Sequence, residues 1–574
     1  MTRYSLMLIA LFFTTVMNAQ PIFEKSDTLR GSLNENRDWF DILKYDITVT
    51  PNFDNKTIQG TVAWKAKVNK QGAKIQVDLQ QPLVIDSIVL VRINPVPEQT
   101  INLRAIPFSR ENNIALVAVP EKLNLGDEFM LWIAYHGKPR EAVKPPWDGG
   151  WIWKKDSNGK PWVSVACQGL GASVWYPCKD HQSDEPEEGA TVNIYIPDSL
   201  GIVAIANGRL VKEEKLMRSV MNGITNNNLI NFKWEVKNPI NNYNIIPYIG
   251  DYITWNETYP GLKGALDVSY YALREDSLKA RLQFTQVPKM LKAFEYWMGP
   301  YPFYEDGYKL IQAPHLGMEH QSAVAYGNKF ENGYLGRDLS GSGWGKKWDF
   351  IIVHESGHEW FANNISTKDI ADNWVHEGFT NYTETLFTEY YYGIKAGNEY
   401  NYGTRKGIAN RTPIIGPYGV NGEGSGDMYS KGGNLLHTIR HSINNDKRFR
   451  AVLTGLNETF YHKTVTTKEI EDYISLYGKF NFSKVFDQYL RTTQIPVFSY
   501  TIDRIEKLLT YQWRNCVPGF DLPLNFNYFG NQISLRPIEF VPQKISFKNE
   551  SFDIDEFIKE LELMYYVKAV EERY

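Results

Sequence analysis

Cysteine is scarce in this chain: only Cys167, Cys178 and Cys516 occur among 574 residues. A small and odd number excludes the dense disulfide framework that stabilises small secreted domains. Cys167 and Cys178 could pair in an oxidising compartment, and buried free thiols are at least as good an interpretation. None of the three has the spacing of a zinc site that is built from cysteines.

The chain also lacks a large excess of charge of either sign. Its 62 Lys and Arg residues nearly balance 66 Asp and Glu residues, which leaves a net charge of −4. Such a balance gives no indication of binding to nucleic acid or to an anionic membrane surface. We therefore expect no nucleic-acid partner.

Long hydrophobic runs are absent as well. The longest candidate, from Leu6 to about Met17, is too short to span a bilayer. It follows Arg3 and precedes Ala19, a pattern typical of a secretory signal peptide, with a buried N-terminal strand as the alternative. We expect residues 1–19 to be a signal peptide, and the mature protein to be secreted or periplasmic without stable insertion in a membrane.

A length of 574 residues exceeds what one hydrophobic core supports and predicts about three or four domains. From residue 20 to 260 the pattern is one of short strands separated by turns. Residues 45–49 and 61–66 alternate with period two, and Asn52 to Asn55 form a turn between them. This region is predicted to be one large, mainly antiparallel β domain.

The pattern becomes helical between residues 261 and 494. Residues 278–298 and 346–365 have helical periodicity, and Pro288 is expected to start or break a helix within the first segment. Residues 495–574 suggest short strands and predict a small β-sandwich, although residues 555–570 fit a helix or a strand equally well. The expected fold class is therefore multidomain α+β.

The most informative pattern is His354-Glu355-Ser356-Gly357-His358, followed by Glu377 after eighteen residues. This is an H-E-x-x-H…E arrangement. Positions i and i+4 share one face of a helix, so the two imidazoles can hold one ion. Two nitrogens and one carboxylate suit Zn²⁺ and leave a fourth position for water. Glu355 would lie beside the metal, where a general base is needed.

The alternative is a surface helix with two solvated histidines. It is disfavoured because an apolar run, residues 350–353, leads into the motif and residues 360–362 continue the apolar pattern beyond it. Burying two histidines and a glutamate without a metal would leave polar groups without partners. Glu377 lies in residues 373–384, which are predicted to form a second helix.

Together with two further motifs, this pattern resembles the gluzincin aminopeptidases of the M1 family, which include aminopeptidase N and leukotriene A4 hydrolase. Gly317-Met318-Glu319-His320 resembles the family's G-[AG]-M-E-N exopeptidase motif. Residues 429–432, Tyr-Ser-Lys-Gly, resemble its Y-x-K-G motif. The resemblance covers residues 35 to 495 and is densest between 301 and 433. It implies a saddle-like N-terminal β domain and a thermolysin-like catalytic domain, and we expect the large C-terminal helical domain common in the family to be absent.

The resemblance also implies the chemistry. One Zn²⁺ per chain, held by His354, His358 and Glu377, would activate water, with Glu355 as general base, to hydrolyse the N-terminal bond of peptides. Tyr429 would donate a hydrogen bond to the oxyanion, the alternative being a packed surface aromatic.

Other residues of the resemblance concern the substrate and the ligand environment. Glu319 would bind the free ammonium of the substrate, and Gly317 and Met318 would line the site beside it. Gln168 would line the pocket for the first side chain, or serve as an ordinary loop residue. Glu384 would orient a metal-binding histidine, or remain solvated.

The chain departs from the family pattern at Leu316, His320 and His376, which affects the shape of the substrate pocket but not the metal ligands. Two alternatives to the aminopeptidase remain: a zinc hydrolase of the same fold that acts on a non-peptide substrate, and a catalytically silent binding protein. The preferred N-terminal residue and the oligomeric state do not follow from the sequence.

Overall fold

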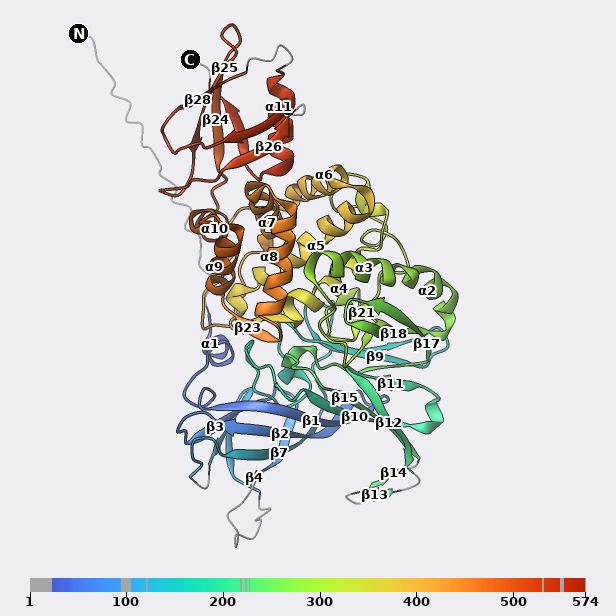
Figure 1. Cartoon of the computed structure of the whole chain (residues 1–574). Helices are drawn as coiled ribbons and strands as arrows, with labels where there is room; N and C mark the ends of the chain where they lie inside the picture. Colours follow the sequence, from blue (N-terminus) through green and yellow to red (C-terminus); the bar gives the residue numbers. More distant parts are fainter. Residues whose placement is uncertain are drawn as a thin grey trace, which may run out of the picture.

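The computed structural model describes residues 23–93, 105–119, 122–216, 219–221, 224–226, 228–528, 531–547 and 552–572. The predicted signal peptide lies outside these residues. Within them the chain forms a β-rich N-terminal part, a mainly helical middle part and a smaller C-terminal part (Figure 1). The fold class expected from the sequence, an N-terminal β domain followed by a helical catalytic domain, is confirmed.

The N-terminal part is built around a seven-stranded sheet of order β12-β15-β10-β1-β2-β7-β4. A four-stranded sheet (β11-β16-β9-β8) and a three-stranded sheet (β3-β6-β5) pack with it into one hydrophobic core. The strands are β1 (Phe40–Asn52), β2 (Thr57–Val68), β3 (Lys74–Asp78), β4 (Val84–Arg92), β5 (Phe108–Glu111), β6 (Ile114–Ala118), β7 (Glu128–Gly137), β8 (Gly150–Lys155), β9 (Pro161–Ala166), β10 (Ala190–Pro197), β11 (Val203–Ile205), β12 (Arg209–Leu216), β15 (Leu229–Val236) and β16 (Tyr248–Gly250). The short hairpin of β13 (Ser219–Met221) and β14 (Ile224–Asn226) extends from this region.

The period-two pattern of the sequence explains the central strands. In β1, Tyr45, Ile47 and Val49 are fully buried, while the residues between them are partly exposed. β1 pairs antiparallel with β2 and parallel with β10, so the sheet is mainly but not entirely antiparallel. One face of the sheet therefore supplies the core of the N-terminal part.

The predicted domain boundary between residues 260 and 261 falls at the tip of the hairpin formed by β17 (Tyr252–Gly261) and β18 (Gly264–Leu273). This hairpin joins β19 (Tyr308–Gln312), β21 (Val324–Tyr326) and β20 (Gly317–Met318) in a five-stranded sheet, order β17-β18-β19-β21-β20. Leu266 and Val268 pack in the same core as the helices of the middle part, whereas Tyr252 and Leu273 pack in the core of the N-terminal part. The hairpin therefore contributes to both hydrophobic cores.

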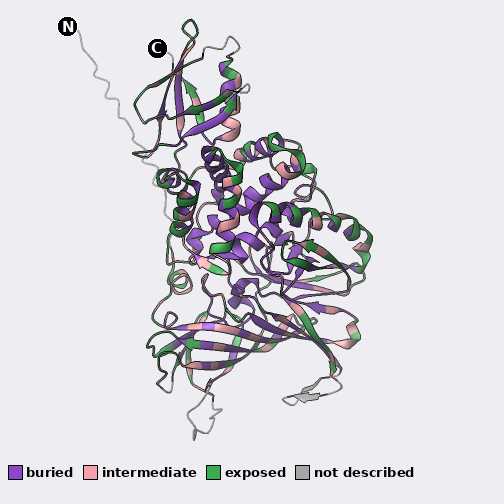
Figure 2. Ribbon diagram, viewed as in Figure 1, coloured by how far each residue is buried: buried purple, intermediate pink, exposed green. Residues whose placement is uncertain are grey.

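Helices cover this second sheet and form most of the rest of the middle part (Figures 1 and 2). They are α2 (Ser277–Gln283), α3 (Val287–Met298), α4 (Phe350–Gly357), α5 (Trp374–Tyr392), α6 (Ile394–Thr404), α7 (Ser430–Ile443), α8 (Asp446–Thr459), α9 (Thr467–Gly478) and α10 (Ser483–Arg491). A short parallel pair, β22 (Ile365–Thr367) and β23 (Lys463–Val465), links two segments of this region. α4 and the first four turns of α5 are buried almost throughout, so polar side chains on them are held inside the protein.

One helix prediction is confirmed and another needs adjustment. Pro288 starts α3, since it lies in the first turn, where its missing N–H costs nothing. The helix expected over residues 346–365 is shorter, because α4 begins only after Asp349 and the regular turn ends near His358. Ala362 then adopts a positive φ of 137°, which a helix cannot contain.

The C-terminal part contains a four-stranded sheet of order β28-β25-β24-β29 and a hairpin of β26 and β27. Its strands are β24 (Val497–Asp503), β25 (Leu508–Arg514), β26 (Leu524–Tyr528), β27 (Asn531–Leu535), β28 (Gln543–Ser546) and β29 (Lys568–Glu571). The predicted β-sandwich is only partly right, because the helix α11 (Ile554–Met564) packs with the hairpin, through contacts such as Phe526 with Phe557. The ambiguous segment 555–570 is thus a helix followed by a strand.

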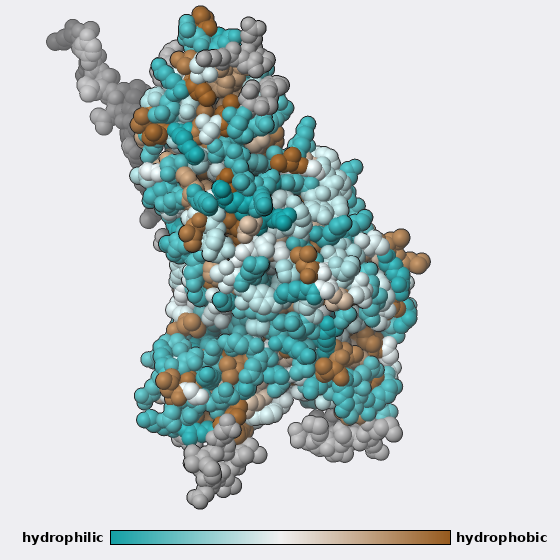
Figure 3. Space-filling view, viewed as in Figure 1, coloured by the Kyte–Doolittle hydropathy of each residue, from teal (hydrophilic) through white to brown (hydrophobic). Residues whose placement is uncertain are grey.

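An N-terminal helix, α1 (Lys25–Gly31), connects the first and second parts through a hydrogen bond from the Asn421 N–H to the Asp27 carbonyl. Cys167, Cys178 and Cys516 are all free thiols, so the possible pairing of the first two is not formed. In the described part of the chain no helix is long and apolar enough to cross a bilayer. Apolar residues on the face seen in Figure 3 are scattered in small patches.

Candidate metal centre and active-site cavity

Asp349 starts the helix that carries the H-E-x-x-H pentad. Its carboxylate accepts hydrogen bonds from the N–H groups of Ile351 and Ile352, which caps the first turn of α4. The apolar residues 351–353 pack into the core. His354 and Glu355 follow on the buried helix and line one cavity together with His358. The apolar run in the sequence is therefore the anchor that holds the polar pentad inside the protein.

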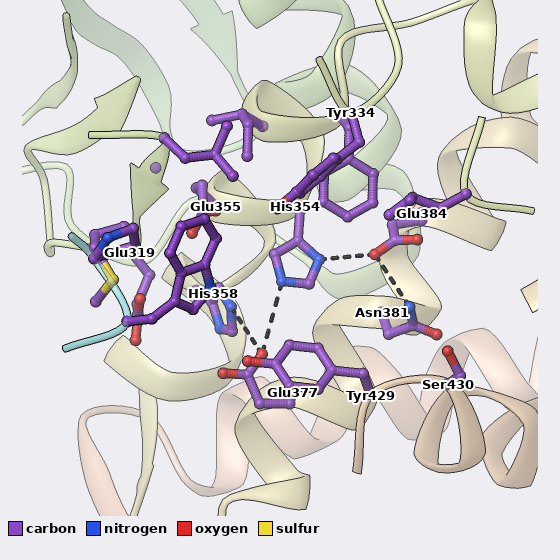
Figure 4. Close-up of a pocket in the computed structure, with 18 of the residues that line it drawn as sticks. Glu319, Tyr334, His354, Glu355, His358, Glu377, Asn381, Glu384, Tyr429 and Ser430 are labelled. Atoms are coloured by element: carbon purple, nitrogen blue, oxygen red, sulfur yellow. Dashed lines mark hydrogen bonds and ion pairs between the residues drawn. The ribbon is translucent and has the colours of Figure 1, made fainter. Parts of the chain in front are cut away.

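Three side chains converge as the motif predicts. His354, His358 and Glu377 each offer a ligand atom, and these atoms lie within 4.8 Å of one another (Figure 4). Glu377 Oε2 is 3.7 Å from His354 Nε2 and 3.4 Å from His358 Nε2. All three residues are buried. Glu377 is carried by the first turn of α5, so two helices supply the three ligand atoms.

The outward nitrogens of both histidines have partners that fix the orientation of the rings. His354 Nδ1 donates to Glu384 Oε1 at 2.7 Å, and His358 Nδ1 donates to the Phe361 carbonyl at 3.1 Å. Glu384 is in turn held by the Tyr400 hydroxyl at 2.6 Å and by the Asn381 amide at 3.2 Å. The Nε2 atom of each ring therefore keeps a free lone pair, which is directed toward Glu377.

These residues fit a zinc ion. Glu377 Oε2 is buried and has no hydrogen-bond partner among the described residues, a costly arrangement unless a cation binds there. Burial alone would raise the pKa of the Glu377 carboxyl, but the nearby imidazoles of His358 and His354 hold that pKa below its usual range. Two imidazole nitrogens and one carboxylate are a set of donors typical of catalytic zinc.

Glu355 lines the same cavity but is not one of the three predicted metal ligands, which are the two histidines and Glu377. Burial raises the pKa of its carboxyl to about 7, against the lowering effect of the two imidazoles. A carboxylate with a pKa near neutrality is suited to accept and return a proton. Gly317 lies directly opposite: a Cβ at that position would be 2.8 Å from Glu355 Oε1, so only glycine leaves room for the base.

Tyr429 directly precedes the first residue of α7. Its ring stacks on that of His354 with centroids 6.0 Å apart, and its hydroxyl-bearing side chain lines the cavity. The residue is 37% exposed, but desolvation inside the cavity, and then the nearby charge of Glu377, raise the pKa of its hydroxyl well above the usual value, so it stays a hydrogen-bond donor. The approach of α7 to α5 depends on a glycine pair, because a Cβ on Gly432 would be 2.8 Å from the Cα of Gly378.

Glu319 enters the same cavity from the end of β20, opposite α5 (Figure 4). Its side chain is buried, which raises the pKa of its carboxyl, and Oε1 accepts a hydrogen bond of 3.0 Å from the Tyr243 hydroxyl. Tyr243 belongs to the N-terminal part, and its neighbour Asn244 bonds to Asn363, whose amide holds the Glu319 carbonyl at 2.7 Å. Glu319 is thus held by residues from both parts of the chain, Tyr243 at its carboxylate and Asn363 at its backbone carbonyl.

The cavity that joins these groups has a volume of about 540 Å³. The other predicted lining residues, Gln168, Gly317 and Met318, all contribute to its wall. The structure therefore brings every predicted site residue to one place, with Glu384 behind His354. Sequence reasoning missed Tyr243, Tyr400, Lys406 and Trp147, which lie outside the motifs; no local signal in the sequence marks them.

The three departures from the family pattern have different surroundings. Leu316 lines the cavity, whereas His320 and His376 are fully buried and do not line it. His320 Nδ1 bonds to the Tyr248 hydroxyl. Neither ring nitrogen of His376 has a hydrogen-bond partner among the described residues, and burial lowers the pKa of this imidazole to about 3, so it is neutral. The substitution that can alter the substrate pocket directly is therefore Leu316.

Comparison with known proteins identifies related domains in both the N-terminal and the middle part of the chain. A model of the peptidase family M1 domain matches residues 284–489, and a model of the peptidase M1 N-terminal domain matches residues 42–243. Leukotriene A-4 hydrolase of Xenopus laevis is 23% identical over 63% of this chain and 57% of its own length. Endoplasmic reticulum aminopeptidase 1 of Homo sapiens is 23% identical over 63% of this chain and 38% of its own length. The chain thus matches less than two thirds of the length of these relatives.

Solved structures extend the likeness to the fold. An M1 zinc metallopeptidase mutant from Deinococcus radiodurans, bound to a Tyr-Ser-Ala substrate, superposes with a TM-score of 0.61 at 18% identity. The match covers 79% of this chain and 95% of that one. The same mutant without the substrate gives a TM-score of 0.63. With matching domain models on both the β-rich and the catalytic part, and the three motifs gathered around one cavity, the chain belongs to peptidase family M1.

Proposed function

We propose that this protein is a zinc-dependent aminopeptidase that hydrolyses the N-terminal bond of peptides. The observation that carries the proposal is the pairing of two features in one cavity: the His354, His358 and Glu377 triangle, and the buried carboxylate of Glu319. A metal triangle alone would suit any hydrolase. A fixed, buried carboxylate beside it suits a substrate that carries a positive charge next to the bond to be cut.

His354, His358 and Glu377 would hold the ion through Nε2, Nε2 and a carboxylate oxygen. Zinc, when bound, supplies a Lewis acid that polarises the scissile carbonyl and lowers the pKa of water. Glu384 keeps the His354 ring oriented through the 2.7 Å hydrogen bond, and the Phe361 carbonyl does the same for His358. The protein therefore prepares the ligand set before the metal arrives.

The other residues would handle the proton and the developing charge. Glu355 accepts a proton from the attacking water and passes it to the nitrogen of the departing amine, which its pKa of about 7 allows in both directions. The Tyr429 hydroxyl donates a hydrogen bond to the substrate oxygen as negative charge develops on it. Loss of one such donor reduces turnover by about 100- to 1000-fold in comparable sites.

Glu319 would determine where the chain is cut. Its carboxylate binds the free ammonium of the substrate, and this fixes the first peptide bond at the metal. An internal segment of a peptide has no cation at that place and would leave the buried carboxylate without a partner, which is costly. An exopeptidase follows from this geometry, and the same reasoning excludes efficient cutting of N-acetylated peptides.

The test uses two variants, one expected to lose turnover and one expected to lose the preference for free amines. Glu355→Gln should retain zinc, measured by atomic absorption, and lose turnover of aminoacyl-coumarin substrates. Glu319→Ala should retain zinc and lose its preference for free amines over N-acetyl substrates. Full activity of Glu355→Gln would refute the mechanism, and an unchanged preference in Glu319→Ala would show that Glu319 does not recognise the substrate ammonium.

The proposal extends to the compartment. The N-terminal sequence, with Arg3 ahead of the apolar stretch that ends near Met17 and Ala19 shortly after it, supports export and removal of residues 1–19. A secreted or periplasmic enzyme would meet peptides outside the cytosol. N-terminal sequencing of the exported protein should begin at or near residue 20, and recovery of an intact N-terminus from the cytosol would contradict export.

A further inference from the structure

The charges that line the active-site cavity are strongly one-sided. Five glutamates and two histidines line the cavity, and among its described lining residues Lys406 is the only lysine or arginine. Neither the metal triangle nor the catalytic base needs this cation. Its place in the cavity therefore calls for a separate explanation.

Lys406 is held at the rim by its neighbours while its own charge stays available. It lies in the single turn Arg405–Gly407 that follows α6. Arg405 points away from the cavity: its Nε donates to Asn434 Oδ1 at 2.7 Å, and its guanidinium lies over the Tyr566 ring. Lys406 is exposed and has no hydrogen bond or ion pair with any other described residue. Its ammonium lies against Gly341, where a Cβ would come within 2.3 Å of Nζ.

The neighbour of Lys406, Gly407, places this residue on the Ser430 side of the cavity, away from Glu319. Figure 4 shows Glu319 on one side of the metal ligands and Ser430 on the other. Gly407, next to Lys406, is close to Ser430, since a Cβ at Gly407 would be 3.7 Å from Ser430 Oγ. Ser430 also begins α7, a helix of 14 residues without a side-chain cap, and its positive N-terminal end adds to the charge of Lys406.

Two acidic groups of this region do not pair with Lys406. Glu423 lines the same cavity and is exposed. Asp338 accepts hydrogen bonds from the N–H groups of Ser340 and Gly343, at 2.9 Å and 2.6 Å. Neither carboxylate forms an ion pair with Lys406. The cavity thus has a carboxylate at one end, the hydrolytic centre in the middle and an unpaired ammonium at the other end.

We propose that Lys406 binds the C-terminal carboxylate of short peptides, so that the enzyme prefers substrates of two to a few residues with both ends free. This subsite rests on the proposed aminopeptidase function and adds a substrate class to it. A cavity of about 540 Å³ is of the size that encloses a small ligand. Because a peptide runs from its ammonium at Glu319 through the scissile bond, only a short one places its carboxylate at Lys406. A longer peptide would extend past the rim.

The expected preference is moderate, because Lys406 is exposed and solvent screens its charge. We expect the free acid to be cleaved with a kcat/KM roughly threefold to tenfold above that of the matching C-terminal amide, at the one length that reaches Lys406. The preference should shrink as the salt concentration rises, since screening weakens an exposed ion pair. At longer lengths the ratio of acid to amide should return to about one.

The test measures kcat/KM for peptides of two to six residues, each as the free acid and as the C-terminal amide. The wild-type protein is compared with Lys406→Met, with Lys406→Arg, and with Lys395→Met, a matched control on α6 whose side chain is 85% exposed. Lys406→Met should lower the acid-to-amide ratio to about one at every length, through a lower kcat/KM for the acids. Lys406→Arg should keep most of the ratio, and Lys395→Met should behave as wild type.

Two outcomes would overturn the proposal: a wild-type ratio near one at all lengths, or a ratio that survives in Lys406→Met. Either would leave the aminopeptidase assignment intact, because the amides would still be cleaved from their free N-terminus. Failure of the proposed function looks different, since neither acids nor amides would then be cleaved by a zinc-loaded sample.

Discussion

Tyr243→Phe removes one oxygen atom and tests how the ammonium-binding carboxylate is positioned. The Tyr243 hydroxyl donates to Glu319 Oε1 at 3.0 Å, and both side chains are buried. A hydrogen bond to a charged group contributes about 1.5–3 kcal/mol. Loss of this donor should therefore reduce kcat/KM for free-amine substrates by about tenfold to a hundredfold.

The reduction should lie mainly in KM. Glu319 contacts the substrate ammonium before and during the reaction, so weaker positioning affects substrate and transition state alike. The zinc content should be unchanged, because Tyr243 touches none of the three ligands. Steady-state kinetics on aminoacyl-coumarins, together with metal analysis of the same samples, measure both quantities.

Tyr252→Phe provides the matched control. Its hydroxyl is also buried and donates a 2.8 Å hydrogen bond, but to the Gln312 carbonyl and away from the cavity. This variant should lose some thermal stability and keep the wild-type KM. The reasoning is refuted if Tyr243→Phe has a KM within about twofold of wild type, or if Tyr252→Phe raises KM equally.

Three further predictions concern the helices, the ligand environment and pH. Gly432→Ala should lower both Tm and activity, because the new methyl group would clash with the Gly378 Cα and such overpacking costs about 1–3 kcal/mol. Gly426→Ala is the control, since open space surrounds its Cβ, and it should change neither quantity. Thermal unfolding and activity assays measure both. Glu384→Gln should weaken zinc binding by about tenfold to a hundredfold in competition with a chelator, and retention of wild-type affinity would show that the 2.7 Å contact with His354 is unimportant. Burial raises the pKa of the Asp184 carboxyl from 3.8 to about 7, so the folded state binds this proton more tightly and loses stability as pH rises through that window. Asp184→Asn should remove this loss, so the Tm of the variant relative to wild type should increase between pH 5 and 8, and a constant difference would contradict the assignment.

The metal centre was predictable from the sequence because its rules are local. The spacing of His354 and His358 follows from the turn of a helix, and the apolar residues before them indicate burial. Glu377 and Tyr429 were predicted from short motifs. The glycine of the second motif, Gly432, is required by packing, because α7 contacts α5 at this point. What could be predicted was therefore what a short stretch of chain determines by itself.

Residues that meet only in three dimensions were not predictable. Tyr243 lies 76 residues before Glu319 and belongs to another part of the chain. Lys406 resembles any surface lysine until the cavity shows what it faces. The division of the strands into separate sheets was not predictable for a related reason: strands of different sheets have the same period, and only their pairing separates them.

The central claim is that one cavity holds both a zinc-dependent hydrolytic centre and a carboxylate that requires a free N-terminus. The most direct measurement is the cleavage of aminoacyl-coumarins, each as the free amine and as its N-acetyl form, with and without a zinc chelator. The account predicts cleavage of the free amines alone, lost with the chelator and restored by added zinc. Equal cleavage of both forms, or activity that survives complete removal of the metal, would contradict it.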